Sequence, residues 1–103
     1  MPYATLLSDN EIVAALAGLP AWRRQGDAIV REHRFPTFRE AIAFVDRVAD
    51  LAEAADHHPD IDIRWRRVVL SLTTKASHGL TARDVGLATQ IDADIEASEA
   101  AER

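Results

Sequence analysis

Three segments of the chain begin with the same short pattern, a hydroxyl residue followed three positions later by a carboxylate residue. The pattern spans residues 8–11, 37–40 and 81–84. In such a capping box the hydroxyl accepts from a free N–H of the first helical turn, and the carboxylate reaches back to the N–H of the capping residue. Apolar residues recur at helical spacing after each box. The sequence therefore predicts three helices, of which the one after Thr37 is the longest and most clearly amphipathic.

Prolines and glycines mark where two of these helices end. Gly18 and Pro20 end the first helix after a few turns. Pro59 disfavours helical geometry at His58 and has no N–H to continue the hydrogen-bond ladder, so the second helix should end near Asp56.

Between the helices the pattern is typical of strands. Residues 28–35 are β-compatible, and residues 22–25 can pair with them across Gly26-Asp27. Apolar and charged residues alternate from residue 61 to 66, which predicts a half-buried strand. Residues 68–74 are a second β-rich segment, and Arg66-Arg67 is the expected turn between the two strands. The expected fold is α+β with the order αββαββα, in which a four-stranded antiparallel sheet carries three helices on one face.

Length and charge limit the classes of function. The 103 residues suit one domain, 1–103, and the formal net charge of -5 disfavours binding to nucleic acid. The chain has no cysteine, which excludes thiolate chemistry and disulfides. Residues 1–7 do not resemble a signal peptide, and no apolar stretch is long enough to cross a membrane. We expect a cytoplasmic protein that does not associate with membranes, and a chain this short favours association into oligomers.

Polar residues able to perform acid–base chemistry gather between residues 53 and 84. Glu53 stands three spacers before His57-His58-Pro59, five residues separate Pro59 from Trp65, nine separate Trp65 from Lys75, and eight separate Lys75 from Asp84. Residues 79–81 read Gly-Leu-Thr. This arrangement resembles the pterin-4a-carbinolamine dehydratase family. The similarity extends to Trp22, to residues 35–38 and to the order of the elements, so that it covers nearly the whole chain.

The resemblance implies dehydration of a 4a-hydroxytetrahydropterin to quinonoid dihydropterin, with no cofactor and no metal. Histidine suits both the acid and the base of this reaction because its pKa lies near neutrality. The implied catalytic residues are His57, His58, Glu53, Lys75 and Asp84. The implied pterin-binding residues are His57, His58, Pro59, Trp65, Thr74, Lys75, Ala76, Ser77, His78 and Arg83. The family also implies a homodimer or homotetramer, formed through sheet edges and helices.

One position departs from the pattern, because Lys75 stands where the family usually has a third histidine. Free lysine is protonated at neutral pH and is a poor base, although His78 lies three residues downstream. The departure keeps an alternative open: a dehydratase-like protein with little or no activity that acts through protein contacts. Examples are a carboxysome-associated Rubisco assembly factor and a dimerisation cofactor of a transcription factor.

Each candidate residue also has a structural explanation. His57 and His58 follow a helix end, where a cationic side chain is favourable by itself. Asp84 is accounted for as the third residue of its capping box, and Glu53 can pair with His57 on one helical face. Trp65 is as well explained by a place in the core as by contact with a substrate. A zinc site made of His57, His58 and His78 lacks ligand spacing and is disfavoured.

Overall fold

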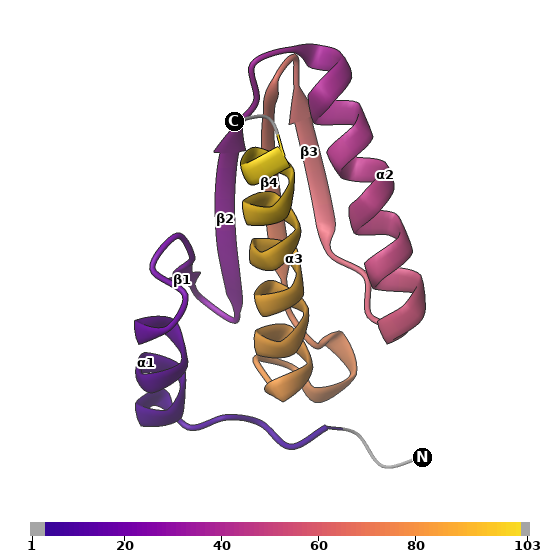
Figure 1. Ribbon diagram of the computed structural model, residues 1–103. Coiled ribbons are helices and arrows are strands. Elements are labelled where there is room, and N and C mark those ends of the chain that lie inside the picture. The colour runs from indigo at the N-terminus through magenta and orange to yellow at the C-terminus, as the bar shows by residue number, and fades with distance from the viewer. Residues whose placement is uncertain (1–3, 102–103) are drawn as a thin grey trace.

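The computed structural model describes residues 4–101 and contains three helices, four strands and one short 3-10 turn, η1 (Figure 1). Along the chain the elements are α1 (Asp9–Ala17), β1 (Arg23–Gln25), β2 (Ala28–Arg34), α2 (Phe38–Ala55), β3 (Asp60–Arg64), β4 (Arg67–Leu72), η1 (Lys75–Ser77) and α3 (Ala82–Ala101). The predicted order αββαββα is confirmed.

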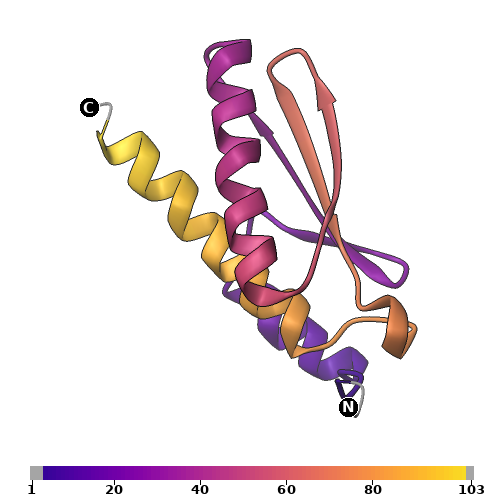
Figure 2. The ribbon, with the colours of Figure 1, turned by 90° about the vertical axis from the view of Figure 1, so that its right-hand side faces the viewer.

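The four strands form one antiparallel sheet in the order β1-β2-β4-β3. The hairpin β1–β2 turns at Gly26, whose φ of 62° is readily adopted by glycine. Strand β4 lies in the centre, where Leu70 pairs with Arg31 on one side and with Ile61 on the other. The helices cover one face of the sheet, with α2 and α3 lying across it and α1 beside the start of α3 (Figure 2).

The hydrophobic core fills the space between this sheet face and the helices. Alternate residues of β4 point into it, and Val68, Leu70 and Leu72 are almost fully buried. From the helices, Phe44 and Ile91 are both 0 % exposed. The middle parts of α2 and α3 supply most of their core residues. Residues at the ends of these helices line two clefts described below.

The three predicted capping boxes form to different extents. Ser8 and Glu11 exchange both hydrogen bonds, at 3.1 and 2.8 Å. Thr37 accepts from the N–H of Glu40 at 3.1 Å, but the Glu40 side chain does not return to the Thr37 N–H. In the third box, the carboxylate of Asp84 accepts from the Thr81 N–H at 2.9 Å. The incomplete box leaves the Glu40 carboxylate available for other contacts.

Two details of the β3–β4 hairpin differ from the sequence prediction. The turn lies at Trp65 and Arg66 rather than at Arg66-Arg67, and Trp65 takes the left-handed position with a φ of 57°. Strand β3 was predicted to be half-buried, but four of its five residues are exposed. The reason is its place at the sheet edge, where no other strand among residues 4–101 pairs with its outer side, and Ile61 is 38 % exposed.

Within residues 4–101, no helix is both long enough and apolar enough to cross a membrane.

Candidate functional site

The end of α2 determines where the two consecutive histidines point. Asp56 adopts a left-handed conformation with φ 49° and ψ 45°, and the N–H of His57 returns to the carbonyl of Ala52 at 3.1 Å. This is a Schellman-type helix ending, which reverses the direction of the chain within one residue. It places His57 inside the protein, with 7 % of its side chain exposed, while His58 remains at the surface, with 56 % exposed.

His57 is paired with the buried carboxylate of Asp84. The distance from His57 Nε2 to Asp84 Oδ1 is 2.5 Å, and Asp84 is 0 % exposed. Since Nε2 is engaged, Nδ1 is the ring nitrogen that has no hydrogen-bond partner among residues 4–101. A carboxylate in this arrangement fixes the orientation of the ring.

The loop between β4 and α3 holds the carboxylate in place. Oδ2 of Asp84 accepts from the hydroxyl of Thr74 at 2.8 Å and from the backbone N–H of Thr81 at 2.9 Å. The hydroxyls of Thr74 and Thr81 lie 2.8 Å apart and join the same network. The buried Asp84 thus accepts three hydrogen bonds, from His57, Thr74 and Thr81, which offsets the cost of removing its charge from water.

The outer side of the site is built from exposed charged groups. His58 Nε2 hydrogen-bonds to the carboxylate of Glu53 on the last turn of α2. Lys75 Nζ lies 3.9 Å from Asp60 Oδ1, and both side chains are at least 75 % exposed. Exposed ion pairs of this kind are screened by solvent and contribute little to stability.

These groups surround a cleft of about 280 Å³. Its lining residues are Asp56, His57, His58, Thr73, Thr74, Lys75, Ala76 and Arg83. Arg83 also donates to the carbonyl of Asp56 at 2.5 Å, so its positive charge sits at the C-terminal end of α2, where the helix dipole favours a cation. The volume lies just below the range usual for small-molecule sites, about 300 to 1,000 Å³.

Most of the residues predicted for the site meet here. His57, His58, Thr74, Lys75, Ala76 and Arg83 line the cleft directly. Asp84 and Glu53 lie outside it and act on it through their hydrogen bonds to the two histidines.

Of the ten residues predicted to bind the pterin, four do not line this cleft: Pro59, Trp65, Ser77 and His78. Trp65 is 69 % exposed at the tip of the β3–β4 hairpin, about 16 Å away along the five residues of β3. His78 is exposed and closes η1 in a left-handed conformation, so in this loop geometry it does not replace the third histidine. Ser77 instead donates to the carbonyl of Ala4 at 2.7 Å.

Three residues escaped the sequence reasoning. Asp56 and Thr73 line the cleft through their positions next to His57 and Thr74. Thr81 was seen only as a capping residue, although its hydroxyl and its N–H both belong to the network around Asp84. The Gly-Leu-Thr segment was the only signal for it. Within residues 4–101, no group of three or more histidine and carboxylate side chains converges as a metal site would require.

The chemistry available at this cleft is proton transfer. It presents a buried histidine held by a carboxylate, an exposed histidine beside a second carboxylate, and an exposed ammonium group. Two imidazoles in different surroundings suit the paired acid and base steps of an elimination or hydration reaction.

Comparisons with known proteins agree with this geometry. Residues 5–93 match the family model described as pterin 4 alpha carbinolamine dehydratase. A relative from Roseiflexus sp. (strain RS-1), named "Putative pterin-4-alpha-carbinolamine dehydratase", is 61% identical over 86% of this chain and 96% of its own. A relative of the same name from Nocardia farcinica is 58% identical over 84% of this chain and 92% of its own.

Two solved structures share the fold. One, described as a transcriptional coactivator/pterin dehydratase from Brucella Melitensis, has a TM-score of 0.83 and 32% identity, covering 86% of this chain and 97% of that chain. The other is a pterin dehydratase-like protein described as a RuBisCO assembly factor in the alpha-carboxysome, with a TM-score of 0.62 and 26% identity over 71% of this chain and 87% of its own. The chain belongs to the pterin-4a-carbinolamine dehydratase family.

Proposed function

We propose that the protein dehydrates a 4a-hydroxytetrahydropterin to the quinonoid dihydropterin. The observation that carries this proposal is the buried His57–Asp84 pair at the wall of a cleft of about 280 Å³. The name of the family and the names of its relatives support the same reaction class.

In the proposed reaction the bond between C4a and the hydroxyl oxygen breaks, and the N5–H bond breaks with it. The hydroxyl group leaves as water after receiving a proton, and the electron pair of the N5–H bond forms the new double bond between N5 and C4a. One proton is thus supplied and one removed, so the net charge of the protein is unchanged. The two histidines have then exchanged protonation states, and proton exchange with solvent restores the starting state.

We assign the base to His57 and the acid to His58. Asp84 hydrogen-bonds to His57 and stabilises the imidazolium that forms when the ring takes the N5 proton. His58, at the exposed rim beside Glu53, supplies a proton to the leaving hydroxyl and exchanges protons with solvent. Proton transfers of this kind contribute about 10² to 10⁴ in rate each.

The test is turnover of a 4a-hydroxytetrahydropterin by the wild-type protein and by the His57→Ala/His58→Ala double variant. The double variant should lose turnover while remaining folded by circular dichroism. Turnover equal to that of the wild type in the double variant would sink the proposal. The single variants separate the roles, because loss of the base removes the acidic limb of the pH–rate profile and loss of the acid removes the basic limb.

A second candidate function rests on Lys75. The expected third histidine is absent and the lysine that replaces it is 81 % exposed and weakly paired. One structural relative, at 26% identity, is described as a RuBisCO assembly factor. In this candidate the fold serves protein contacts and the wild-type chain has negligible turnover, whereas Lys75→His creates it. Substantial wild-type turnover would refute this candidate.

Self-association is part of the proposal in either case. Strand β3 is a free edge of the sheet, and Ile61 on it is 38% exposed. A sedimentation measurement of molar mass distinguishes a monomer of 11.4 kDa from a dimer or tetramer.

A further inference from the structure

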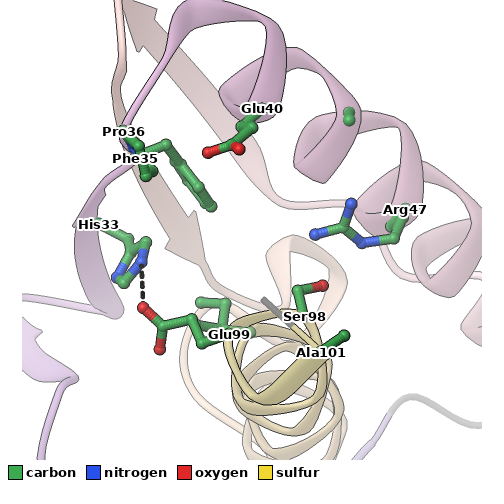
Figure 3. Close-up of a pocket in the computed structure, with 10 residues that line it drawn as sticks. His33, Phe35, Pro36, Glu40, Arg47, Ser98, Glu99 and Ala101 are labelled. Carbon is green, nitrogen blue, oxygen red and sulfur yellow. Dashed lines mark ion pairs between the residues drawn. The ribbon is translucent and has the colours of Figure 1, made fainter. Parts of the chain in front are cut away.

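A second cleft lies at the other end of the sheet, between the end of β2, the first half of α2 and the last turns of α3 (Figure 3). Its volume is about 300 Å³. It is separated from the His57 cleft by the length of the central strands, about 20 Å for the six residues of β4. The two clefts share no lining residue.

One side of this second cleft carries a carboxylate oxygen without a partner. Glu40 Oε2 is buried and accepts no hydrogen bond from any residue between 4 and 101. The side chain is directed toward the cleft rather than back to the Thr37 N–H, which is why the second capping box is incomplete (Figure 3). Native proteins rarely leave a buried carboxylate oxygen unpaired, because its desolvation is not offset. The position calls for a hydrogen-bond donor, and an ammonium group is the best one.

The opposite charge is supplied from the same helix, two turns further on. Arg47 donates through Nε to both carboxylate oxygens of Asp94, at 3.0 Å each. Its two terminal amino groups have no hydrogen-bond partner among the described residues, and the guanidinium extends toward the cleft (Figure 3). Paired guanidinium N–H groups match the two oxygens of a carboxylate.

The remaining wall is largely apolar. Phe35 is buried and packs against Phe44, and Phe35 and Ile95 of α3 both line the cleft. The His33–Glu99 pair, 3.6 Å apart, borders the opening (Figure 3). The cleft thus offers an acceptor, a donor pair and an apolar surface in one place.

Part of this cleft lies outside the residues that match the family model. The match ends at residue 93, and Ile95, Ser98, Glu99 and Ala101 line the cleft. The last two turns of α3 supply this wall.

We propose that this second cleft binds a small amino acid with an apolar side chain. The ammonium group pairs with Glu40, the carboxylate with the terminal amino groups of Arg47, and the side chain packs on Phe35 and Ile95. A simple cation would give Glu40 a donor but leave the terminal N–H groups of Arg47 without an acceptor, and a simple anion would do the reverse. Only a ligand with both charges satisfies both groups. The proposal does not depend on the dehydration reaction.

The experiment is isothermal titration calorimetry of the full chain with three probes of similar size. L-leucine carries both charges, isoamylamine lacks the carboxylate, and isocaproate lacks the ammonium group. We expect saturable binding of L-leucine at one site and affinities lower by about tenfold or more for the two truncated probes, because each loses one charge-assisted hydrogen-bonding group. Absence of saturable L-leucine binding at about 10 mM overturns the proposal. Equal affinity for L-leucine and either truncated probe overturns it as well.

A variant pair locates the site. Glu40→Gln keeps the shape of the side chain and should weaken L-leucine binding about tenfold. Asp46→Asn, on the exposed side of α2, makes the matched change away from the cleft and should leave the affinity unchanged. Circular dichroism establishes that both variants fold. Unchanged affinity in the folded Glu40→Gln variant contradicts the proposed site.

Discussion

His57 and His58 are consecutive residues, and each places Nε2 against a carboxylate, yet their surroundings are opposite. His57 and its partner Asp84 are 7 % and 0 % exposed, whereas His58 and its partner Glu53 are 56 % and 75 % exposed. In the buried pair the low dielectric strengthens each hydrogen bond and makes any missing partner costly. In the exposed pair solvent screens the attraction. The inner wall of the cleft is therefore fixed, and the outer rim is free to move and to exchange protons.

The largest expected effect is on turnover, and it should distinguish the buried His57 from the other histidines. His57→Ala should lower turnover of the hydroxypterin about 10³-fold, because the base is removed from the cleft. The matched control is His33→Gln, which alters a histidine on β2 that does not line this cleft and should leave turnover unchanged. Equal losses in both variants would show that the effect is one of folding rather than of catalysis.

Removing the carboxylate of Asp84 or of Glu53 tests whether the buried pair contributes more to stability than the exposed pair. Asp84→Ala removes the acceptor of hydrogen bonds from His57, Thr74 and Thr81, and should lower the free energy of unfolding by about 3 kcal/mol. Glu53→Ala removes the exposed carboxylate and should cost less than about 0.5 kcal/mol. Urea unfolding of the two variants measures the difference. Similar losses would mean that burial does not distinguish the two pairs.

A substitution at Lys75 tests whether the residue at this exposed position of the cleft limits the rate of turnover. Lys75→His places an imidazole where the family usually has one, and should raise turnover about tenfold if the inner wall is already competent. Because Lys75 is 81 % exposed, stability should stay within about 0.5 kcal/mol of the wild type. A fall in turnover would show that the ammonium group itself contributes to the reaction.

The smallest expected effect concerns the third histidine–carboxylate pair, His33 and Glu99. Burial lowers the pKa of His33 from its ordinary 6.5, and Arg31 lowers it further, while Glu99 opposes the shift. The unfolded chain therefore binds a proton more readily, and this residue's contribution to stability is lost as the pH falls below about 6.5. His33→Gln should flatten the dependence of unfolding free energy on pH between about 5 and 7. An unchanged slope in urea titrations across that range would contradict the assigned direction.

Much of the fold was accessible from local signals. Capping boxes, helical periodicity and the Gly26-Asp27 turn depend on neighbouring residues, and they predicted the helices and the first hairpin. The second hairpin was misplaced by one residue because its turn contains no glycine and Trp65 takes the left-handed position instead. The alternating pattern of β3 predicted burial, but the exposure of an edge strand depends on what packs beside it.

The cleft brings together several residues that the sequence had grouped, but the sequence did not predict how they are arranged. The sequence grouped His57, His58 and Lys75. The difference in burial between the two adjacent histidines follows from the left-handed conformation of Asp56, which the sequence did not predict. Asp84 was predicted both as a cap and, from the resemblance, as a site residue, and its carboxylate hydrogen-bonds to the Thr81 N–H and to His57. Trp65 was misjudged because the hairpin carries it to the far end of β3.

The most direct measurement of the central claim is steady-state dehydration of 4a-hydroxytetrahydrobiopterin by the wild-type protein beside His57→Ala. We predict turnover by the wild type well above the uncatalysed rate and a loss of about 10³-fold in the variant. A wild-type protein that does not exceed the uncatalysed rate, or a folded His57→Ala variant that retains full turnover, would contradict the assignment of the reaction to the buried His57–Asp84 pair.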